Sequence, residues 1–155
     1  MELTATRHSP DDPALAEVLE LIRESFGYME GRIDPPSSMH RMTLASLRED
    51  AQQAEIWSLG PPLSACVVLT PKPLALYIGK LSVAGHARRK GLATRLVTLA
   101  EERAKALGLP ALELQSRVEL TENHATFTAL GFSETGRTSH PGFDRPTSIT
   151  FRRAV

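Results

Sequence analysis

The residues best suited to chemistry lie within 81–94, in the run LSVAGHARRKGLAT. Three consecutive cations directly precede a segment with helical periodicity, namely Arg88, Arg89 and Lys90. A helix N-terminus already carries partial positive charge and unpaired N–H groups, so cations there are unfavourable unless an anion lies among them. Gly91 and Ala93 keep the side-chain volume small, which would let an anion approach the backbone. The segment predicts a phosphate or pyrophosphate site; the alternative is a solvated basic turn.

Two common classes of phosphate site do not fit this segment. A Walker-type loop needs a second glycine five residues after the first, but the residue five after Gly85 is Lys90. The turn also lacks the G-x-G-x-x-G pattern of dinucleotide-binding folds. Walker-type nucleotide hydrolysis and Rossmann-type dinucleotide binding are therefore disfavoured.

The elements that must position this segment follow from hydrophobic spacing and from turn residues. Apolar residues spaced three and four apart predict helices over Pro13–Phe26 and Gly91–Leu107, the second with Gly108 as a left-handed C-cap. Shorter helices are expected over Thr43–Gln52 and over Thr121–Leu130, which Gly131 closes. Strands are predicted over Glu2–Arg7, Ile56–Leu59, Leu63–Leu69, Leu74–Val83, Ala111–Arg117, Phe132–Arg137 and Thr147–Arg152. Hairpins come first and a strand–helix–strand unit later, which indicates a mixed α/β sandwich.

Composition excludes several classes of protein. A chain of 155 residues is expected to form a single domain over 1–155, and none of its apolar runs approaches the ~20 residues that cross a bilayer. The net charge of +0 disfavours nonspecific nucleic-acid binding. The lone Cys66 excludes an internal disulfide and reads as a buried core residue. Without a signal-peptide pattern at the start, we expect a cytoplasmic protein with no nucleic-acid or membrane partner.

The neutral total hides an asymmetry along the chain. Residues 1–60 carry 11 acidic and 5 basic side chains, whereas residues 61–155 carry 7 acidic and 13 basic ones. Either the two halves present opposite fields, which would suit two ligands of opposite charge, or folding interleaves the charges and cancels those fields.

The segment resembles motif A of the GNAT superfamily of acetyl-CoA-dependent N-acyltransferases. The family pattern [RQ]-x-x-G-x-[GA] is met by Arg88, Gly91 and Ala93, directly after the strand end Leu81-Ser82-Val83. The expected order of elements and the helix ending at Gly131-Phe132 extend the resemblance over nearly the whole chain. It implies a mixed, largely antiparallel sheet flanked by helices, in which two parallel strands splay apart at the coenzyme A site.

The resemblance also implies acetyl-CoA as cosubstrate, no metal, and a set of site residues. The N–H of Leu81 would face the acetyl carbonyl and stabilise the oxyanion that forms when an amine attacks the thioester. The implied cofactor-binding residues are Leu81, Ser82, Val83, Arg88, Arg89, Lys90, Gly91, Leu92, Ala93, Thr94, Asn123 and Phe127.

The sequence departs from the family at the positions that often supply the acid and the base. Tyr77 stands where a glutamate base is common, and Phe127 stands where a tyrosine proton donor is common. Tyr77 and His124 are the catalytic candidates that remain, as a relay and a base. The alternatives are a core aromatic and a surface histidine at a helix start. Glu119 and Glu122 read as a solvated turn carboxylate and a helix-start carboxylate.

The acceptor site is expected at the loop Tyr28–Arg41, which the Pro35-Pro36 pair stiffens. The candidate substrate-binding residues are Tyr28, Glu30, Asp34 and His140. Acidic residues there favour a cationic amine over an anionic substrate. We therefore expect transfer of acetyl to the primary amine of a small molecule, by direct attack of the amine on the thioester. A homodimer is a possible assembly. The alternatives are a non-catalytic CoA-binding regulatory module and a protein N-terminal or lysine acetyltransferase.

Overall fold

The computed structural model describes residues 3–29, 31–37 and 41–155, without the side chain of Tyr28. The helices are α1 (Leu15–Phe26), α2 (Leu44–Gln53), α3 (Leu92–Ala106) and α4 (Thr121–Ala129), with short 3-10 turns η1 (Gly27–Met29) and η3 (Gly85–Ala87). The strands are β1 (Thr4–His8), β2 (Glu55–Gly60), β3 (Ala65–Pro71), β4 (Leu76–Val83), β5 (Ala111–Arg117), β6 (Ser133–Thr138) and β7 (Ser148–Ala154). This order of helices and strands matches the expected order.

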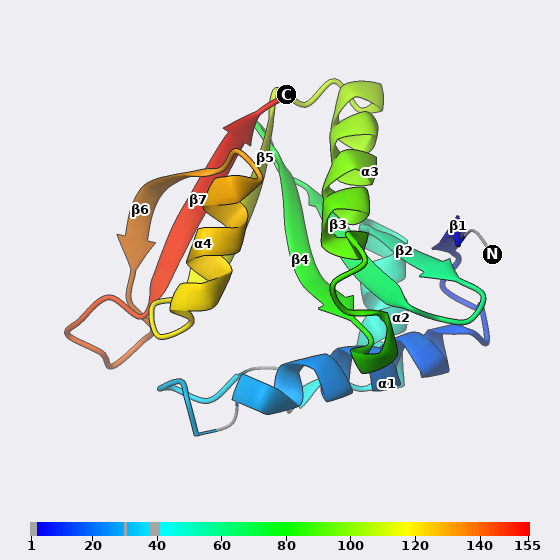
Figure 1. The fold of residues 1–155 in the computed structure, drawn as a ribbon, viewed down its shortest axis with the longest axis horizontal. Helices are drawn as coiled ribbons and strands as arrows, with labels where there is room; N and C mark the ends of the chain where they lie inside the picture. Colours follow the sequence, from blue (N-terminus) through cyan, green and yellow to red (C-terminus); the bar gives the residue numbers. More distant parts are fainter. Residues whose placement is uncertain (1–2, 30, 38–40) are drawn as a thin grey trace.

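The strands form a seven-stranded sheet in the order β1-β2-β3-β4-β5-β7-β6. Neighbours are antiparallel except for β4 and β5, which are parallel. The parallel pair has only two partnered positions, Leu76 with Leu112 and Tyr77 with Glu113. Beyond these the strands diverge, and Figure 1 shows β4 and β5 opening towards their C-terminal ends. The expected fold, including its splayed parallel pair, is confirmed.

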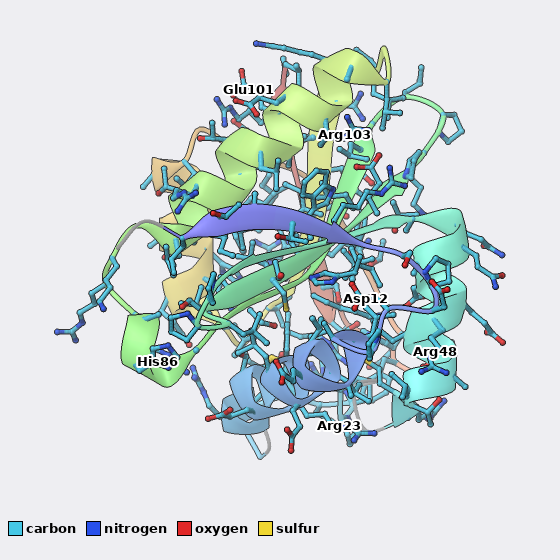
Figure 2. All side chains as sticks on the ribbon, turned by 90° about the vertical axis from the view of Figure 1, so that its right-hand side faces the viewer. Asp12, Arg23, Arg48, His86, Glu101 and Arg103 are labelled. Atoms are coloured by element: carbon cyan, nitrogen blue, oxygen red, sulfur yellow. The ribbon has the colours of Figure 1, made fainter. Side chains whose placement is uncertain are left out.

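The helices cover both faces of the sheet and bury its core. Figure 2 shows α3 on one side of the β1–β4 part of the sheet and α1 and α2 on the other. The apolar stripe of α1 explains its position, because Leu15, Val18 and Ile22 share one face and are almost fully buried. Burial on both faces is also why β3 is a continuous apolar run from Ala65 to Leu69.

The boundaries of the elements agree with the expected ones to within two residues. Gly108 follows α3 with a φ of +71°, and Thr43 caps α2 by accepting a hydrogen bond from the Ser46 N–H. Helix α1 begins at Leu15 rather than Pro13, because residues 10–13 form turns and the Asp12 carboxylate accepts a hydrogen bond from the Ala14 N–H. Among the described residues, no helix is long and apolar enough to span a bilayer.

Ion pairs join the acidic first part of the chain to the basic remainder. Among the described residues, such pairs are Lys80–Asp50, Arg103–Glu55, Arg145–Asp34 and Arg32–Glu122. Glu55 is 4% exposed, and its two oxygens accept hydrogen bonds from Arg103 at 2.7 and 2.8 Å. Burial alone would raise the pKa of Glu55, but hydrogen bonds from Arg103 and Trp57 outweigh it and lower the pKa. Folding therefore interleaves charges that the sequence separates.

We expect Arg103→Ala to lower the free energy of unfolding by about 3 kcal/mol, because it leaves a buried carboxylate without its cation. Arg137→Ala is the matched control, since Arg137 pairs with Glu134 on an exposed strand and the change should cost less than about 1 kcal/mol. Urea unfolding of both variants at neutral pH measures the difference. Equal losses in the two variants would contradict this role for Glu55.

Candidate functional site

The backbone at the start of α3 has the form of an anion site. Arg89 and Gly91 both adopt left-handed conformations, with φ of +63° and +73°. Gly91 is the N-cap, and no side chain caps the helix. Left-handed turns of this kind direct successive N–H groups into one concavity, where they add to the partial positive charge of the helix end. An added Cβ at Gly85 or Gly91 would meet no atom within 4 Å, so the space beside the backbone is open.

The cations at this helix end have no carboxylate to neutralise them. Arg88, Arg89 and Lys90 are exposed, and none makes a hydrogen bond or ion pair with any described residue. The first turn of α3 also lacks an acidic residue. Cations at a helix N-terminus are electrostatically unfavourable in the folded protein without a ligand, so this arrangement points to a bound anionic ligand. The residues of the expected phosphate site are thus exposed and lie on one turn.

A bulge in β4 lies between this turn and the parallel pair. Cys66 pairs with Ser82 and Val68 with Gly79, so Lys80 and Leu81 together stand opposite Val67. Lys80 has a φ of +53°, and its ammonium is anchored 2.9 Å from an Asp50 oxygen. The regular ladder is therefore interrupted at Leu81, the residue whose N–H was expected to face the acyl carbonyl.

Tyr77 lies where β4 and β5 part. It occupies the last paired position, opposite Glu113. Burial and the Glu113 charge raise the pKa of Tyr77, so its hydroxyl is protonated at neutral pH. It can donate a proton or pass one along, but it is not a base.

Helix α4 places the other predicted residues on the β5 side. The Nε2–H of His124 donates to the carbonyl of Arg117 at 2.8 Å, and its ring centroid lies 5.7 Å from that of Phe151. Phe127 packs against Phe132 and Phe151, with ring centroids 6.2 and 6.0 Å away. His124 and Phe127 therefore hold α4 against the sheet, and Asn123 lies in the first turn of that helix.

The loop after α1 is folded against the end of β5. Met29, Ile33 and Leu120 form a small apolar cluster beneath it. The guanidinium of Arg117 donates to the carbonyls of Pro35 and Pro36, at 2.8 and 3.3 Å. The N–H of Asp34 donates to Oε2 of Glu119 at 3.1 Å, and Oε1 of Glu119 is buried without a hydrogen-bond partner in the described structure. The expectation that Glu119 is a solvated turn carboxylate is wrong.

The loop between β6 and β7 adds His140 and Arg145 to this cluster. Arg145 donates to the Asp34 carboxylate at 3.1 Å, and the backbone N–H of His140 donates to the Thr147 hydroxyl, which its Nδ1 also contacts. Burial and the positive charge of Arg117 lower the pKa of His140, and the Glu119 charge opposes this. His140 is therefore largely neutral near pH 7.

The structure thus brings together Asp34 and His140, two of the predicted substrate-binding residues, around Arg117 and Glu119. Glu30 and the side chain of Tyr28 lie outside the described residues. Neither Arg117 nor Glu119 was among the predicted site residues. Arg117 ends β5 and Glu119 lies two residues beyond it, and nothing local to either residue indicates that a loop 82 to 85 residues earlier contacts them.

Two other chemistries find no support in these residues. Burial raises the pKa of the Cys66 thiol to about 12, so this residue has almost no thiolate with which to carry an acyl group. No group of three His, Cys, Asp or Glu side chains suited to a metal occurs in the part of the chain that the structure describes.

The structure thus combines a splayed parallel pair, a bulge on one of its strands and a cation-flanked start of the next helix, which are the features that the resemblance led us to expect. The family model described as "Acetyltransferase (GNAT) family" matches residues 15–132. The chain belongs to this family and is an acyltransferase. A comparison with functionally curated proteins finds no match.

Solved structures with the same fold include three informative examples. The PaiA N-acetyltransferase from Thermoplasma acidophilum, in complex with coenzyme A, is 13% identical with a TM-score of 0.79 and full coverage of both chains. A GNAT family acetyltransferase from Elizabethkingia anophelis with acetyl-CoA bound is 15% identical, with a TM-score of 0.70 and 99% coverage of both. The ribosomal-protein alanine N-acetyltransferase from Escherichia coli is 16% identical, with a TM-score of 0.70 and coverage of 97% of this chain and 94% of that one. At these identities the likeness shows the fold.

We expect Glu119→Ala to release the loop over 27–37, because the Asp34 N–H loses a charged acceptor worth about 1.5–3 kcal/mol. Hydrogen exchange of peptides from this loop should accelerate by about tenfold. Glu122→Ala is the control, since its pair with Arg32 ties the same loop but is exposed and should matter little. Equal acceleration of hydrogen exchange in both variants would show that Glu119 does not stabilise the loop more than the exposed Arg32–Glu122 pair does.

Proposed function

We propose that this protein is an N-acetyltransferase that moves acetyl from acetyl-CoA to a primary amine of a small molecule, by direct attack and without a covalent enzyme intermediate. The observation that carries the donor is the unneutralised set of cations and N–H groups at the start of α3. Coenzyme A presents a pyrophosphate that matches such a site. The complexes of the Thermoplasma and Elizabethkingia proteins, which share the fold, agree with this donor.

The donor would lie along the diverging strands. The N–H groups of residues 89–94 hold the pyrophosphate, with Arg88, Arg89 and Lys90 around it and the small Ala93 and Gly91 leaving room. Leu92 and Thr94 take part through their backbone. Ser82 and Val83 offer backbone groups to the pantetheine arm, and Asn123 and Phe127 border it from α4. The interrupted ladder at Leu81 leaves its N–H suited to stabilising the oxyanion.

The acceptor would enter from the side of the Asp34, Glu119 and His140 cluster. Oε1 of Glu119 has no partner in the described structure and can accept an N–H from an amine. His140 is largely neutral, and if its Nδ1 proton bonds to Thr147, its Nε2 is left to take the proton that the amine must lose. The folded loop narrows this side, which favours a small molecule over a protein chain. His124 is a weaker base candidate, since its Nε2 already bonds to Arg117, and Tyr77 is suited to protonating the leaving thiolate.

An acceptor screen tests the proposal. The intact protein is supplied with acetyl-CoA and, separately, polyamines, amino acids, aminoglycoside-like amines and peptides with free N-termini or lysines, and thiol release is followed. We expect small amines to give turnover above background hydrolysis. For the best amine, Glu119→Gln should raise its KM about tenfold through the lost charged hydrogen bond, while the KM for acetyl-CoA stays unchanged. Glu122→Gln is the control. Turnover with peptides alone would overturn the choice of a small-molecule acceptor. No turnover with any acceptor would contradict the proposed acetyl transfer and would favour a CoA-binding module without catalytic activity.

A pair of glycine variants tests the donor site. Gly91→Ala and Gly108→Ala both force alanine into a left-handed conformation, with φ of +73° and +71°, so each should destabilise the fold by about 1 kcal/mol. Only Gly91→Ala adds a Cβ to the open space beside the N–H groups that are proposed to hold the pyrophosphate. We expect its KM for acetyl-CoA to rise about tenfold, as for one lost charge-assisted bond. If Gly108→Ala has the same effect on KM, or Gly91→Ala has none, the donor site is misplaced.

A further inference from the structure

A chain of three side chains joins β1, β2 and the turn before α1, on the edge of the sheet opposite to β6. The Oγ of Ser58 lies 2.7 Å from Nε2 of His8, and Nδ1 of the same ring lies 2.8 Å from Oδ2 of Asp12. Figure 2 labels Asp12 on the segment that leads from β1 to α1. The histidine thus contacts a serine through one ring nitrogen and a carboxylate through the other. Catalytic triads have the same order, in which the serine is the nucleophile, the histidine is the base and the carboxylate orients the histidine.

The hydrogen bonds fix the direction in which a proton would move. Asp12 is held by a second bond, from the Ala14 N–H to Oδ1 at 2.9 Å, and hydrogen bonds from His8 and Ala14 lower its pKa, so it is a carboxylate that can only accept. In the neutral ring the proton therefore lies on Nδ1, and Nε2 carries the lone pair. Ser58 must then donate its hydroxyl proton to Nε2. This is the arrangement that raises the nucleophilicity of a serine.

The serine and the histidine border a cavity of about 410 Å³, which is within the size range of small-molecule sites. Its wall comes from the outer end of β1 and β2, from the start of α1 and from the turn that follows β2, and Glu17 is the only acidic residue among the described residues that line it. Ser58 and His8 are 6% and 7% exposed, so bulk water has little access to the bond between them. Such a site suits a small ester without negative charge.

The hydroxyl of Thr6 is a hydrogen-bond donor that could stabilise the negative charge that develops on the carbonyl oxygen of an ester during attack. Thr6 is the register partner of Ser58 across the antiparallel pair, which places their Cβ atoms about 4.5–5.5 Å apart on one face. Its side chain lines the same cavity and makes no hydrogen bond within the described structure. A carbonyl oxygen attacked by Ser58 would lie within reach of this hydroxyl.

We propose that Ser58, His8 and Asp12 form a second site in which Ser58 is a nucleophile towards small uncharged esters, apart from acetyl transfer. Ser58 Oγ bonds to the acyl carbon while the ester C–O bond breaks, and His8 passes the serine proton to the departing alcohol. Water then attacks the acyl-serine, His8 returns a proton to Ser58 Oγ, and a carboxylic acid leaves. Ester and water are consumed, and acid and alcohol are formed.

Fluorophosphonate labelling of the intact protein tests this site, because that reagent phosphonylates activated serines with loss of fluoride. We expect a single adduct by intact mass, located on Ser58 by peptide mapping. Ser58→Ala should abolish the adduct, and Asp12→Asn should slow its formation at least about tenfold. Ser116→Ala is the matched control: Ser116 is also buried in a strand, but its hydroxyl has no hydrogen-bond partner in the described structure, so the change should leave labelling unchanged.

Three outcomes would overturn the proposal. One is the absence of an adduct on the wild-type protein under conditions that fully label a serine hydrolase. Another is an adduct located elsewhere, and the third is an undiminished rate in Asp12→Asn, which would mean that the hydrogen-bonded chain does not activate Ser58. Thermal melts of each variant, with and without acetyl-CoA, separate loss of fold from loss of reactivity. If the protein fails to bind acetyl-CoA but Ser58 is labelled, the donor proposal fails and this one stands.

Discussion

The parting of β4 from β5 is the constraint on which the rest of the site depends. Two strands that share only two partnered positions leave backbone groups beyond Tyr77 without a partner in the other strand. Such groups carry a cost in a folded protein unless water or a ligand satisfies them. The divergence persists because each strand is held from its other side, β4 by β3 and β5 by β7 along its whole length. The sheet thus stays continuous while it exposes backbone donors and acceptors at its centre.

The segment that connects the diverging strand β4 to the start of α3 has an unusual backbone conformation. Between the bulge at Lys80 and Leu81 and the first turn of α3, the chain passes through three left-handed positions, at Lys80, Arg89 and Gly91. Only the last is glycine, so the other two are held by their surroundings. For Lys80 the anchor is visible, because its ammonium pairs with Asp50. Arg89 has no such anchor among the described residues, which is consistent with a conformation that an anion completes.

Local patterns predicted most of the fold, because α1 and α3 carry their own apolar stripes and many of the turns contain glycine or proline. The segment 81–94 was predictable for the same reason, since chemistry and geometry there lie within one stretch of chain. Glu119 was not predictable from its neighbours. Its surroundings come from Asp34, which lies 85 residues earlier, and nothing local to a carboxylate after a strand indicates that a distant loop will cover it. The separation of charge along the chain left two outcomes open for the same reason, and the structure favours the interleaved one, because folding pairs Arg103 with Glu55.

The hydrogen-bonded chain of Ser58, His8 and Asp12 also could not be predicted from sequence, because it joins residues that are distant along the chain. His8 and Asp12 are four residues apart, yet residues 10–13 are turns, so helical spacing does not explain their contact. Ser58 reaches them only because β1 pairs with β2 in the register that places Thr6 opposite Ser58 and His8 opposite Ile56. A shift of that register by one residue would turn Ser58 to the other face of the sheet and break the chain. The arrangement of these three side chains at this edge of the sheet is therefore a property of strand pairing, and it is independent of the divergence of β4 from β5.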